Sequence, residues 1–389
     1  MHLDESYDVL VVGARCAGAA VAMLMARRGL KVLAIDRSGY GTDTISTHAL
    51  MRGGVLQLHR WGLLPRLREM ATPSVCSTTF HYGEEAIEVA IRPANGVGAL
   101  YAPRRTVLDS VLVDAAVEAG AEVRHGHTLV ALLRGGRDDR VTGGVVLDPE
   151  GRPRHIKARL VVGADGIGSY VARLVQAPVL RAARAATAVV YGHWSDLVAE
   201  GYHWHYVPGA SIGVIPTNAG RHCVFASVPP SRFRNSFHGN AMAGYHGVLC
   251  EVAPSLAKEL MASRLESRLW AFGGRKGFLR KAHGAGWALV GDAGYFKDPL
   301  TAHGITDALR DAELLADAAV ADTEEAMARY ATIRDELSLP LFEATEAIAA
   351  FEWDLERLKL HHQALNRAMK QEVEFLTTLS AAPIEEMTQ

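Results

Sequence analysis

The chain is poor in cysteine. Its four cysteines, Cys16, Cys76, Cys223 and Cys250, lie far apart in 389 residues and form no Cys-x-x-Cys pair. This spacing signals neither a zinc site nor a redox-active dithiol. Such cysteines suit a reducing compartment, so we expect a cytoplasmic protein.

The sequence also lacks an excess of one charge and any long apolar run. Lys and Arg number 41 against 43 Asp and Glu, which gives no overall field to attract nucleic acid or an anionic membrane. No run reaches the roughly 18 apolar residues of a membrane span, and the first residues lack the pattern of a signal peptide. We therefore expect no nucleic-acid partner, no membrane span and no export. The overall composition, with 49% hydrophobic and 22% charged residues, is typical of a globular protein, and the length of 389 residues allows two or three domains.

The first 36 residues have the pattern of strand, turn, helix and strand. The apolar run 7–12 predicts a strand buried on both faces, the small residues 17–28 predict a helix closed by Gly29, and 31–35 predicts the next parallel strand. A helix over 106–118 and a strand over 159–162 extend this parallel α/β pattern.

The remainder of the chain changes character twice. Residues 184–230 hold short β-rich runs separated by Gly, Pro and Asn, which predicts an antiparallel sheet. A buried strand is predicted over 288–290, and residues 304–379 are almost wholly helical, with Pro340 as the one internal break. No internal repeat or low-complexity segment is visible.

The first turn carries the first chemical signal. Gly13, Arg15 and Gly18 occupy the three fixed positions of a G-x-G-x-x-G loop, and Asp36 ends the second strand 23 residues after Gly13. A helix N-terminus at such a turn faces a pyrophosphate, and Asp36 can accept hydrogen bonds from ribose hydroxyls. Arg15 departs from the pattern, so its side chain must turn away or act as a cationic phosphate partner. The alternative is a glycine turn of any parallel α/β protein.

Two later turns place an acidic residue beside glycine. They are Gly163-Ala-Asp165-Gly166-Ile-Gly-Ser169, followed by Arg173, and Gly291-Asp292-Ala293, followed by Pro299 and by Gly304 at a helix start. In this order along the chain, the three turns resemble the FAD-binding pattern of the class A flavoprotein monooxygenases and the related geranylgeranyl-reductase-like flavoproteins. The resemblance spans most of residues 1–340.

The resemblance implies roles for these residues. Asp165 and its turn would contact FAD and a transiently docked NAD(P)H, and Asp292 would hold the ribityl chain, because a carboxylate accepts hydrogen bonds from hydroxyls. The helix after Pro299 would point its positive end at the flavin N1 and O2 region. Arg105 fits the family's arginine that reaches FAD, although an Arg pair at 104–105 is more often a solvated helix cap. The cofactor-binding residues implied are Gly13, Ala14, Arg15, Ala17, Gly18, Asp36, Arg37, Arg105, Leu129, Asp165, Gly166, Gly291, Asp292, Pro299 and Gly304.

These features together predict an α/β fold. We expect a Rossmann-like FAD-binding domain with a parallel sheet, of the glutathione-reductase type, a substrate domain with an antiparallel sheet, and C-terminal helices. The predicted ranges are 1–75, 99–178 and 269–339 for the FAD-binding domain, 76–98 and 179–268 for the substrate domain, and 340–389 for the helical segment. No second G-x-G-x-x-G loop follows a later strand, so we expect no separate nicotinamide domain.

Several other residues are candidates for the substrate site. His303 stands where many class A enzymes carry the Gln of a G-Q-G turn, so the resemblance implies that it lies near the flavin. There it would tune the flavin charge or donate a proton, or it would only supply a positioning hydrogen bond with no role in proton transfer. Other candidates for the substrate cavity are His48, Trp204, Tyr206, Tyr295 and Phe296. His203 and His205 alternate on a predicted strand and could form a metal pair, but no third ligand is apparent nearby, so we predict no metal site.

The leading hypothesis is an NAD(P)H-dependent FAD monooxygenase that oxygenates a small, aromatic substrate through a flavin C4a-hydroperoxide, with O₂ as co-substrate. The alternatives are a reductase or dehydrogenase of the geranylgeranyl-reductase-like type and a non-catalytic flavin-binding redox module. Oligomeric state and substrate identity are not encoded in any pattern we recognise.

Overall fold

The computed structural model describes residues 5–136, 138–237, 239–266 and 268–379. Five parallel strands form the centre of the first sheet, in the order β5-β2-β1-β8-β18. Their bounds are Glu5–Val12 for β1, Val32–Asp36 for β2, Glu122–His125 for β5, Pro153–Gly163 for β8 and Trp287–Leu289 for β18. The strand, turn, helix and strand predicted for the first 36 residues are confirmed.

Both faces of this sheet are covered, which explains why the second half of β1, residues 9–12, is apolar and buried. One face packs against α1 (Cys16–Arg27), α4 (Arg105–Glu118) and α9 (Gly304–Ala321). The other packs against β6 (Thr128–Gly135), β7 (Arg140–Leu147) and α5 (Tyr170–Leu174). Val9 and Val11 face the helices, whereas Leu10 faces β6 and β7.

A second sheet is built around the antiparallel strands β10 (Ala188–Ser195), β13 (Arg221–Val228), β12 (Ala210–Thr217) and β11 (Tyr202–Val207), in that order. The antiparallel sheet predicted over 184–230 is therefore confirmed. The sequence did not predict that β3 (Ser77–Tyr82) pairs in parallel with β11 and continues into β4 (Glu85–Ala90) at the edge. The strands β14 (Arg264–Leu265) and β15 (Trp270–Phe272) pair with β10 at the other edge.

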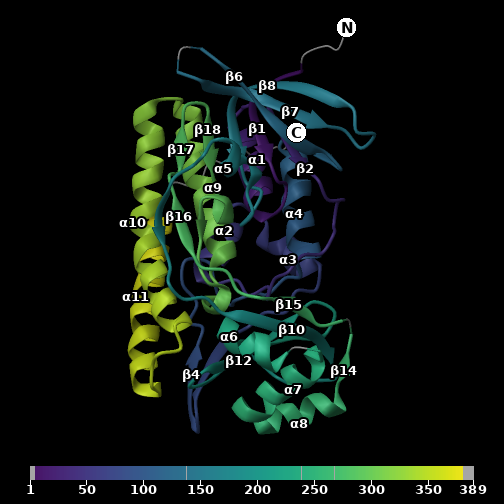
Figure 1. Ribbon diagram of the computed structural model, residues 1–389, viewed down its shortest axis with the longest axis vertical. Helices are drawn as coiled ribbons and strands as arrows, with labels where there is room; N and C mark the ends of the chain where they lie inside the picture. The colour runs from purple at the N-terminus through teal and green to yellow at the C-terminus, as the bar shows by residue number, and fades with distance from the viewer. Residues whose placement is uncertain (1–4, 137, 238, 267, 380–389) are drawn as a thin grey trace.

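The two faces of the second sheet have different neighbours. Helices α7 (Ala241–Val252) and α8 (Pro254–Ala262) follow α6 (Pro230–Ser236) and pack on one face. The opposite face, with Tyr191 and Trp204, shares an apolar cluster with the helices of the first sheet. This second face therefore lies toward the helices of the first sheet. Figure 1 shows β10 and β12 of the second sheet at the opposite end of the molecule from β6 and β7.

Smaller elements connect these layers. A three-stranded sheet joins β9 (Val179–Ala182), β16 (Phe278–Arg280) and β19 (Tyr295–Phe296), and β17 (His283–Gly284) pairs with β18. Helices α2 (Arg52–Arg60) and α3 (Leu64–Glu69) follow the first βαβ unit, and the 3-10 turns η1 (Gly291–Ala293) and η2 (Pro299–Thr301) precede α9.

The C-terminal helices correct one prediction. Pro340 does not break the helical region, because it lies inside the continuous helix α10 (Glu324–Ala349). The breaks come instead at Asp322 and Phe351, whose φ angles of 51° and 54° are left-handed and cannot continue a right-handed helix. After the second break, α11 (Leu355–Thr378) runs beside α10 along one side of the molecule (Figure 1). Within the described ranges, no helix combines the length and apolar character that a membrane crossing requires.

The fold class is therefore as predicted: an α/β fold with a Rossmann-like parallel sheet, a second, largely antiparallel sheet and C-terminal helices. The residue ranges assigned to separate domains stay a prediction.

Candidate functional site

The turn after β1 is sterically restricted to glycine. Gly13 has a φ of 100°, and a Cβ on it would lie 2.4 Å from the carbonyl oxygen of Ala164. A Cβ on Gly18 would lie 1.7 Å from the carbonyl oxygen of Gly13. Glycine at these positions therefore brings the start of α1 close to β1 and also brings the turn at Ala164 against the first turn.

Asp36 lies at the carboxyl end of β2, beside the first turn. One of its oxygens accepts a hydrogen bond from Ala14 N at 2.8 Å, and the other accepts one from Ser38 N at 2.8 Å. The side chain is only half-buried, and each oxygen keeps a second lone pair for a ligand hydroxyl. A small hollow is centred here, and its walls are Ala14, Arg15, Asp36, Ser38, Gly39, Gly41, Thr42, Asp109, Val113 and His125.

The two basic residues of this turn have different environments. Arg15 donates to the carbonyl oxygen of Thr42 at 3.0 Å and to Asp109 at 3.1 Å, so its guanidinium is turned toward that loop and helix α4. Arg37 has an exposed side chain. Leu129, by contrast, is buried in the apolar cluster on the other face of the parallel sheet, so its side chain is part of the hydrophobic core.

Asp109 is a buried residue that the sequence reasoning missed. Its carboxylate accepts hydrogen bonds from Arg105 at 3.1 Å, from Arg15 and from the thiol of Cys16 at 3.0 Å. Asp109 thus holds Arg105 beside the first turn. The available signal was its position four residues after Arg105, which places both on one face of a helix.

Asp165 holds its own turn together. Ser169 Oγ and Tyr170 N each donate to its carboxylate at 2.5 Å, and Val171 N donates at 3.2 Å. The carboxylate therefore binds the N-terminal end of α5, while Gly166 with a φ of 75° completes the bend. Any contact of this turn with a cofactor would come from its backbone more readily than from Asp165.

The turn at Gly291 meets the first turn from the opposite side. Gly291 has a φ of 53°, and a Cβ on it would lie 3.2 Å from the Cβ of Ala17 and 3.2 Å from that of Ala308. Asp292 follows in the 3-10 turn η1, and its Oδ1 lies 3.9 Å from the position that a Cβ on Gly304, at the start of α9, would take. Burial raises the pKa of Asp292 to about 6, although Lys297 and Arg105 act to lower it. The three turns predicted to meet are therefore brought together.

These groups fit an FAD molecule chemically. Asp36 offers a carboxylate for ribose hydroxyls, the N-terminus of α1 suits a pyrophosphate, and Asp292 offers a carboxylate for the ribityl hydroxyls. Gly304 is exposed at the N-terminus of α9, where the positive end of the helix dipole favours the negative charge of a reduced flavin. Pro299 opens the η2 turn that leads into this helix end.

His303 is part of a buried network of charges behind that helix end. Its Nε2 lies 2.6 Å from Glu372 of α11, and Glu372 also accepts a hydrogen bond from Arg310 at 2.7 Å. Arg310 further contacts Asp307 and Asp311, and Lys297 pairs with Asp307. Burial lowers the pKa of His303 despite the neighbouring Glu372. A neutral His303 donates through Nε2 and leaves Nδ1 as an acceptor that has no partner.

Burial also lowers the pKa of Lys297 to about 7, while Glu372 and Asp292 act to raise it. Glu372 was not singled out from the sequence. No local pattern marks this glutamate, since its partners lie about 60 residues earlier on another helix.

A second buried pair lies between the cofactor-binding segments and the second sheet. His48 Nε2 and His193 Nε2 are 2.9 Å apart, both side chains are 1% exposed, and neither Nδ1 has a partner. Burial lowers the pKa of His48 well below its usual range and lowers that of His193 to about 4. His48 also has a φ of 70°, a left-handed conformation that costs about 1–3 kcal/mol in a non-glycine residue. Strain of this kind is found mainly at functional sites.

The predicted substrate residues fall into two groups. Trp204 and Tyr206 lie on the face of β11 that belongs to the apolar cluster shared with the first sheet. His193 lies on the same side of β10, where its ring contacts Tyr191 of that cluster. Tyr295 and Phe296 lie elsewhere, in the small sheet, where the hydroxyl of Tyr295 donates to the carbonyl oxygen of Ser338 at 3.1 Å. The structure therefore brings His48 near the sheet that carries Trp204 and Tyr206, and it does not place Tyr295 in that group.

We predicted no metal site because no third ligand was apparent near His203 and His205. His203 and His205 do share a face of β11, but a third ligand lies nearby: His81 on the adjacent strand β3. The sequence could not show this, because β3 is more than 100 residues away and its parallel pairing with β11 was not predicted.

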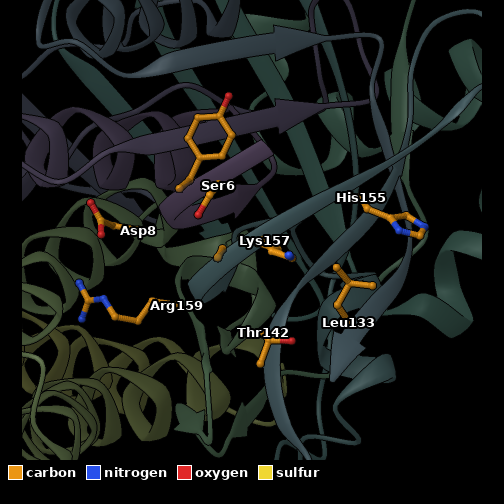
Figure 2. Close-up of a pocket in the computed structure, with 9 residues that line it drawn as sticks. Ser6, Asp8, Leu133, Thr142, His155, Lys157 and Arg159 are labelled. Carbon is orange, nitrogen blue, oxygen red and sulfur yellow. The ribbon is translucent and has the colours of Figure 1, made fainter. Parts of the chain in front are cut away.

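A hollow of about 680 Å³ lies elsewhere in the described part of the chain. Figure 2 shows Ser6 and Asp8 of β1, Thr142 of β7, and Lys157 and Arg159 of β8 around it. Ser6 precedes Gly13 by seven residues of extended chain, which is roughly 20 Å. Ligands of open α/β sheets bind at the carboxyl ends of the strands, so this hollow at the amino end of β1 is not the cofactor site.

Comparisons with known proteins agree with this geometry. A family described as FAD binding domain matches residues 6–330. Digeranylgeranylglycerophospholipid reductase 2 of Methanopyrus kandleri is 29% identical over 333 residues, which cover 82% of this chain and 78% of that relative. The structure of the flavin-dependent brominase Bmp2 superposes with a TM-score of 0.79 at 17% identity, covering 98% of this chain and 96% of that one. PqsL of Pseudomonas aeruginosa, a probable FAD-dependent monooxygenase, superposes with a TM-score of 0.71 at 19% identity, covering 96% and 100%. The two structural similarities show a shared fold.

Proposed function

The chain belongs to the FAD-binding domain family and is an FAD-dependent oxidoreductase, and from this premise we propose that it is an NAD(P)H-dependent monooxygenase of a small aromatic compound. Bound FAD supplies the redox chemistry: it takes up a hydride and passes the electrons on. The protein then has to orient the substrate, exclude water and move protons.

In this proposal the three converging turns hold the cofactor. Asp36 would bind the adenosine ribose, the start of α1 would bind the pyrophosphate, and Asp292 would bind the ribityl chain. The N-terminus of α9 would face the flavin ring. The convergence of Gly13, Ala164 and Gly291 supports this arrangement, because their contacts put all three turns around one place.

The observation that carries the proposal is the His48–His193 pair. Both imidazoles are neutral at pH 7, so one Nε2 must donate to the other. One Nδ1 is then a free acceptor and the other an N–H donor. A hydroxyl or amino group of a substrate can give its proton to the acceptor, while the donor passes a proton on, so the pair moves a proton without carrying a net charge.

The sheet beside the pair favours an aromatic substrate. Trp204, Phe225 and Tyr191 follow one another across strands β11, β13 and β10 on the same face, with Gly213 of β12 between the first two. A Cβ on Gly213 would lie 2.1 Å from the Phe225 ring, so the glycine lets that ring lie flat over β12. Aromatic faces of this kind stack with planar ligands.

A second candidate is the reduction of a carbon–carbon double bond. The specific observation in its favour is the 29% identical relative, whose name describes a lipid reductase. In that chemistry a hydride is added to one carbon and the His48–His193 pair supplies the proton for the other. The same residues therefore serve both candidates, and the product distinguishes them.

The deciding experiment supplies the FAD-loaded protein with NADPH or NADH, ¹⁸O₂ and a panel of phenols, anilines and polyenes, and measures products by mass spectrometry. Monooxygenation predicts a product that contains one ¹⁸O atom, with the second oxygen atom in water. A product that gains two hydrogens and no ¹⁸O, formed equally well without oxygen, would contradict the monooxygenase and support the reductase.

A further inference from the structure

Three histidines meet on the outer face of the second sheet. His203 and His205 are alternate residues of β11, and His81 is the direct neighbour of His205 on the parallel strand β3. One ring nitrogen from each histidine lies within 4.8 Å of one from each of the other two, and all three side chains are half-buried, so solvent ions can reach them. Alternate positions on one strand and a neighbour on the next let three imidazoles converge on one point above the sheet.

We propose that His81, His203 and His205 bind one divalent transition-metal ion, for which Zn²⁺ is the natural occupant. Three imidazoles leave an open fourth position, which is the coordination that zinc accepts with three protein ligands and a water molecule. Imidazole nitrogen also suits Cu²⁺ and Ni²⁺ but not Mg²⁺ or Ca²⁺, which prefer oxygen ligands.

The hydrogen bonds of His203 already orient it as a ligand. Its Nε2 lies 2.8 Å from the carbonyl oxygen of Glu200 and must donate to it, so its Nδ1 carries a lone pair. A metal-binding histidine typically makes such a hydrogen bond with its other nitrogen. That Nδ1 lies 3.2 Å from His81 Nε2, which donates to it. A metal ion would take the place of this shared proton, with His81 protonated on Nδ1 instead.

Neutral imidazole is the form that binds metals, and a lone pair on one ring nitrogen of each histidine has to point at the ion. The rings of His81 and His205 now stack with centroids 3.9 Å apart, so metal binding requires a change of side-chain rotamer in at least one of them.

The position of the cluster indicates a structural role. Trp204 and Tyr206 face the cofactor side of β11, so the histidines between and beside them face away from it. A metal ion there would join β3, which comes from residues 77–82, to β11 of the main antiparallel sheet. We expect it to stabilise the fold and to leave catalysis unchanged.

The test uses the FAD-loaded full-length protein, freed of metal with a chelator and titrated with ZnCl₂ by calorimetry. We expect one saturable site per chain and a higher melting temperature with zinc, because a ligand of the native state stabilises it. His205→Ala should weaken zinc binding by more than about 100-fold, beyond the 10- to 100-fold loss typical of a residue that only orients a ligand.

The matched control is His246→Ala. His246 is also half-buried, contacts Cys250 Sγ on helix α7 through its Nδ1 at 3.5 Å, and does not belong to the three-histidine cluster. This variant should bind zinc as the wild type does. If His205→Ala does not fold, His203→Asn and His81→Gln keep a polar side chain at half-exposed positions and test the same site. Absence of saturable binding in the millimolar range, or binding that persists in all folded variants of the three histidines, would overturn the proposal.

Discussion

Asp292 is the residue whose proposed role can be tested most simply. A carboxylate that accepts hydrogen bonds from FAD hydroxyls contributes roughly 1.5–3 kcal/mol, so Asp292→Asn should weaken FAD binding by about 10- to 100-fold. Fluorescence titration of the apoprotein with FAD measures this directly. Asp317→Asn on the exposed side of α9 is the control and should bind FAD normally, since Asp317 forms only a surface pair with Arg28.

The pKa of Asp292 adds a pH dependence with a definite sign. Burial raises this pKa to about 6, and only the ionised form accepts hydrogen bonds at both oxygens. FAD affinity of the wild type should therefore fall as the pH drops through about 6, and Asp292→Asn should lack this fall. An affinity that is flat between pH 5 and 8, within the range where the protein is folded, would argue against Asp292 as a ligand.

His193 is the residue whose replacement separates catalysis from cofactor binding. His193→Gln keeps a polar side chain but removes the neutral imidazole pair, so we expect turnover to fall by about 10²-fold or more with FAD content unchanged. His222→Gln is the matched control: it is also buried and lies on the neighbouring strand β13, but on the opposite face of the sheet. Equal losses in the two variants would show that the effect is structural.

Residues that sit at turns between strands and helices were the ones the sequence could predict. Gly13, Asp36 and Asp292 belong to local patterns in which each residue type is required by the adjoining backbone. His81 and Glu372 were missed for the opposite reason. Each acts through a partner brought near by packing between distant elements, and no spacing in the chain records that packing.

At the scale of elements, α11 makes the least expected contribution. Its Glu372 completes a buried network with Arg310 and His303, and removal of one partner from a buried ion pair costs about 3–5 kcal/mol. Glu372→Ala should lower the unfolding free energy by that amount in urea denaturation. Glu374→Ala, two residues further and exposed, should change it little.

This network also predicts an acid dependence. His303 and Arg310 hold the pKa of the buried Glu372 carboxyl well below its usual range, against the effect of burial. A lowered pKa in the folded state means that Glu372 stabilises the protein above its ordinary pKa of 4.5 and that this stabilisation is lost as the pH falls below it. The difference in stability between wild type and Glu372→Ala should therefore shrink on acidification below about pH 4.5.

The elements themselves were largely predictable, with one instructive failure. Strands β1 and β2 and helix α1 follow from apolar periodicity and a closing glycine. Pro340 was read as a break because proline removes a helical hydrogen bond. In the structure, buried neighbours such as Phe342 and Ile348 keep α10 continuous past it, so tertiary packing outweighs the local preference.

At the scale of the whole molecule, bound FAD should stabilise the native fold by contacting turns that are far apart in the chain. The first turn, the turn at Ala164 and the turn at Gly291 are separated by more than 100 residues each, and one ligand would contact all of them. A ligand that binds only the native state stabilises it by about 2.7 kcal/mol at 100 times its dissociation constant. Removal of FAD should therefore lower the melting temperature by several degrees in differential scanning calorimetry, and added FAD should restore it. An unchanged melting temperature would mean that the cofactor does not bridge these segments.

The arrangement of the two sheets was predictable only in class. The sequence predicts a parallel sheet and an antiparallel one. It does not predict that β3 pairs with the second sheet, or which face of that sheet packs on the first, because both depend on pairing between strands far apart in the chain. For that reason the sequence named Trp204 and Tyr206 only as candidates for the substrate cavity. The structure shows that their face of β11 packs toward the first sheet, and their contact with substrate stays a prediction.

A crystal structure of the FAD-loaded protein tests the central claim most directly. We predict one flavin per chain, with the adenosine ribose at Asp36, the ribityl chain at Asp292, and the ring between the N-terminus of α9 and the His48–His193 pair. Flavin density in the hollow beside Ser6 and Arg159, or a flavin that contacts neither Asp36 nor Asp292, would contradict the account.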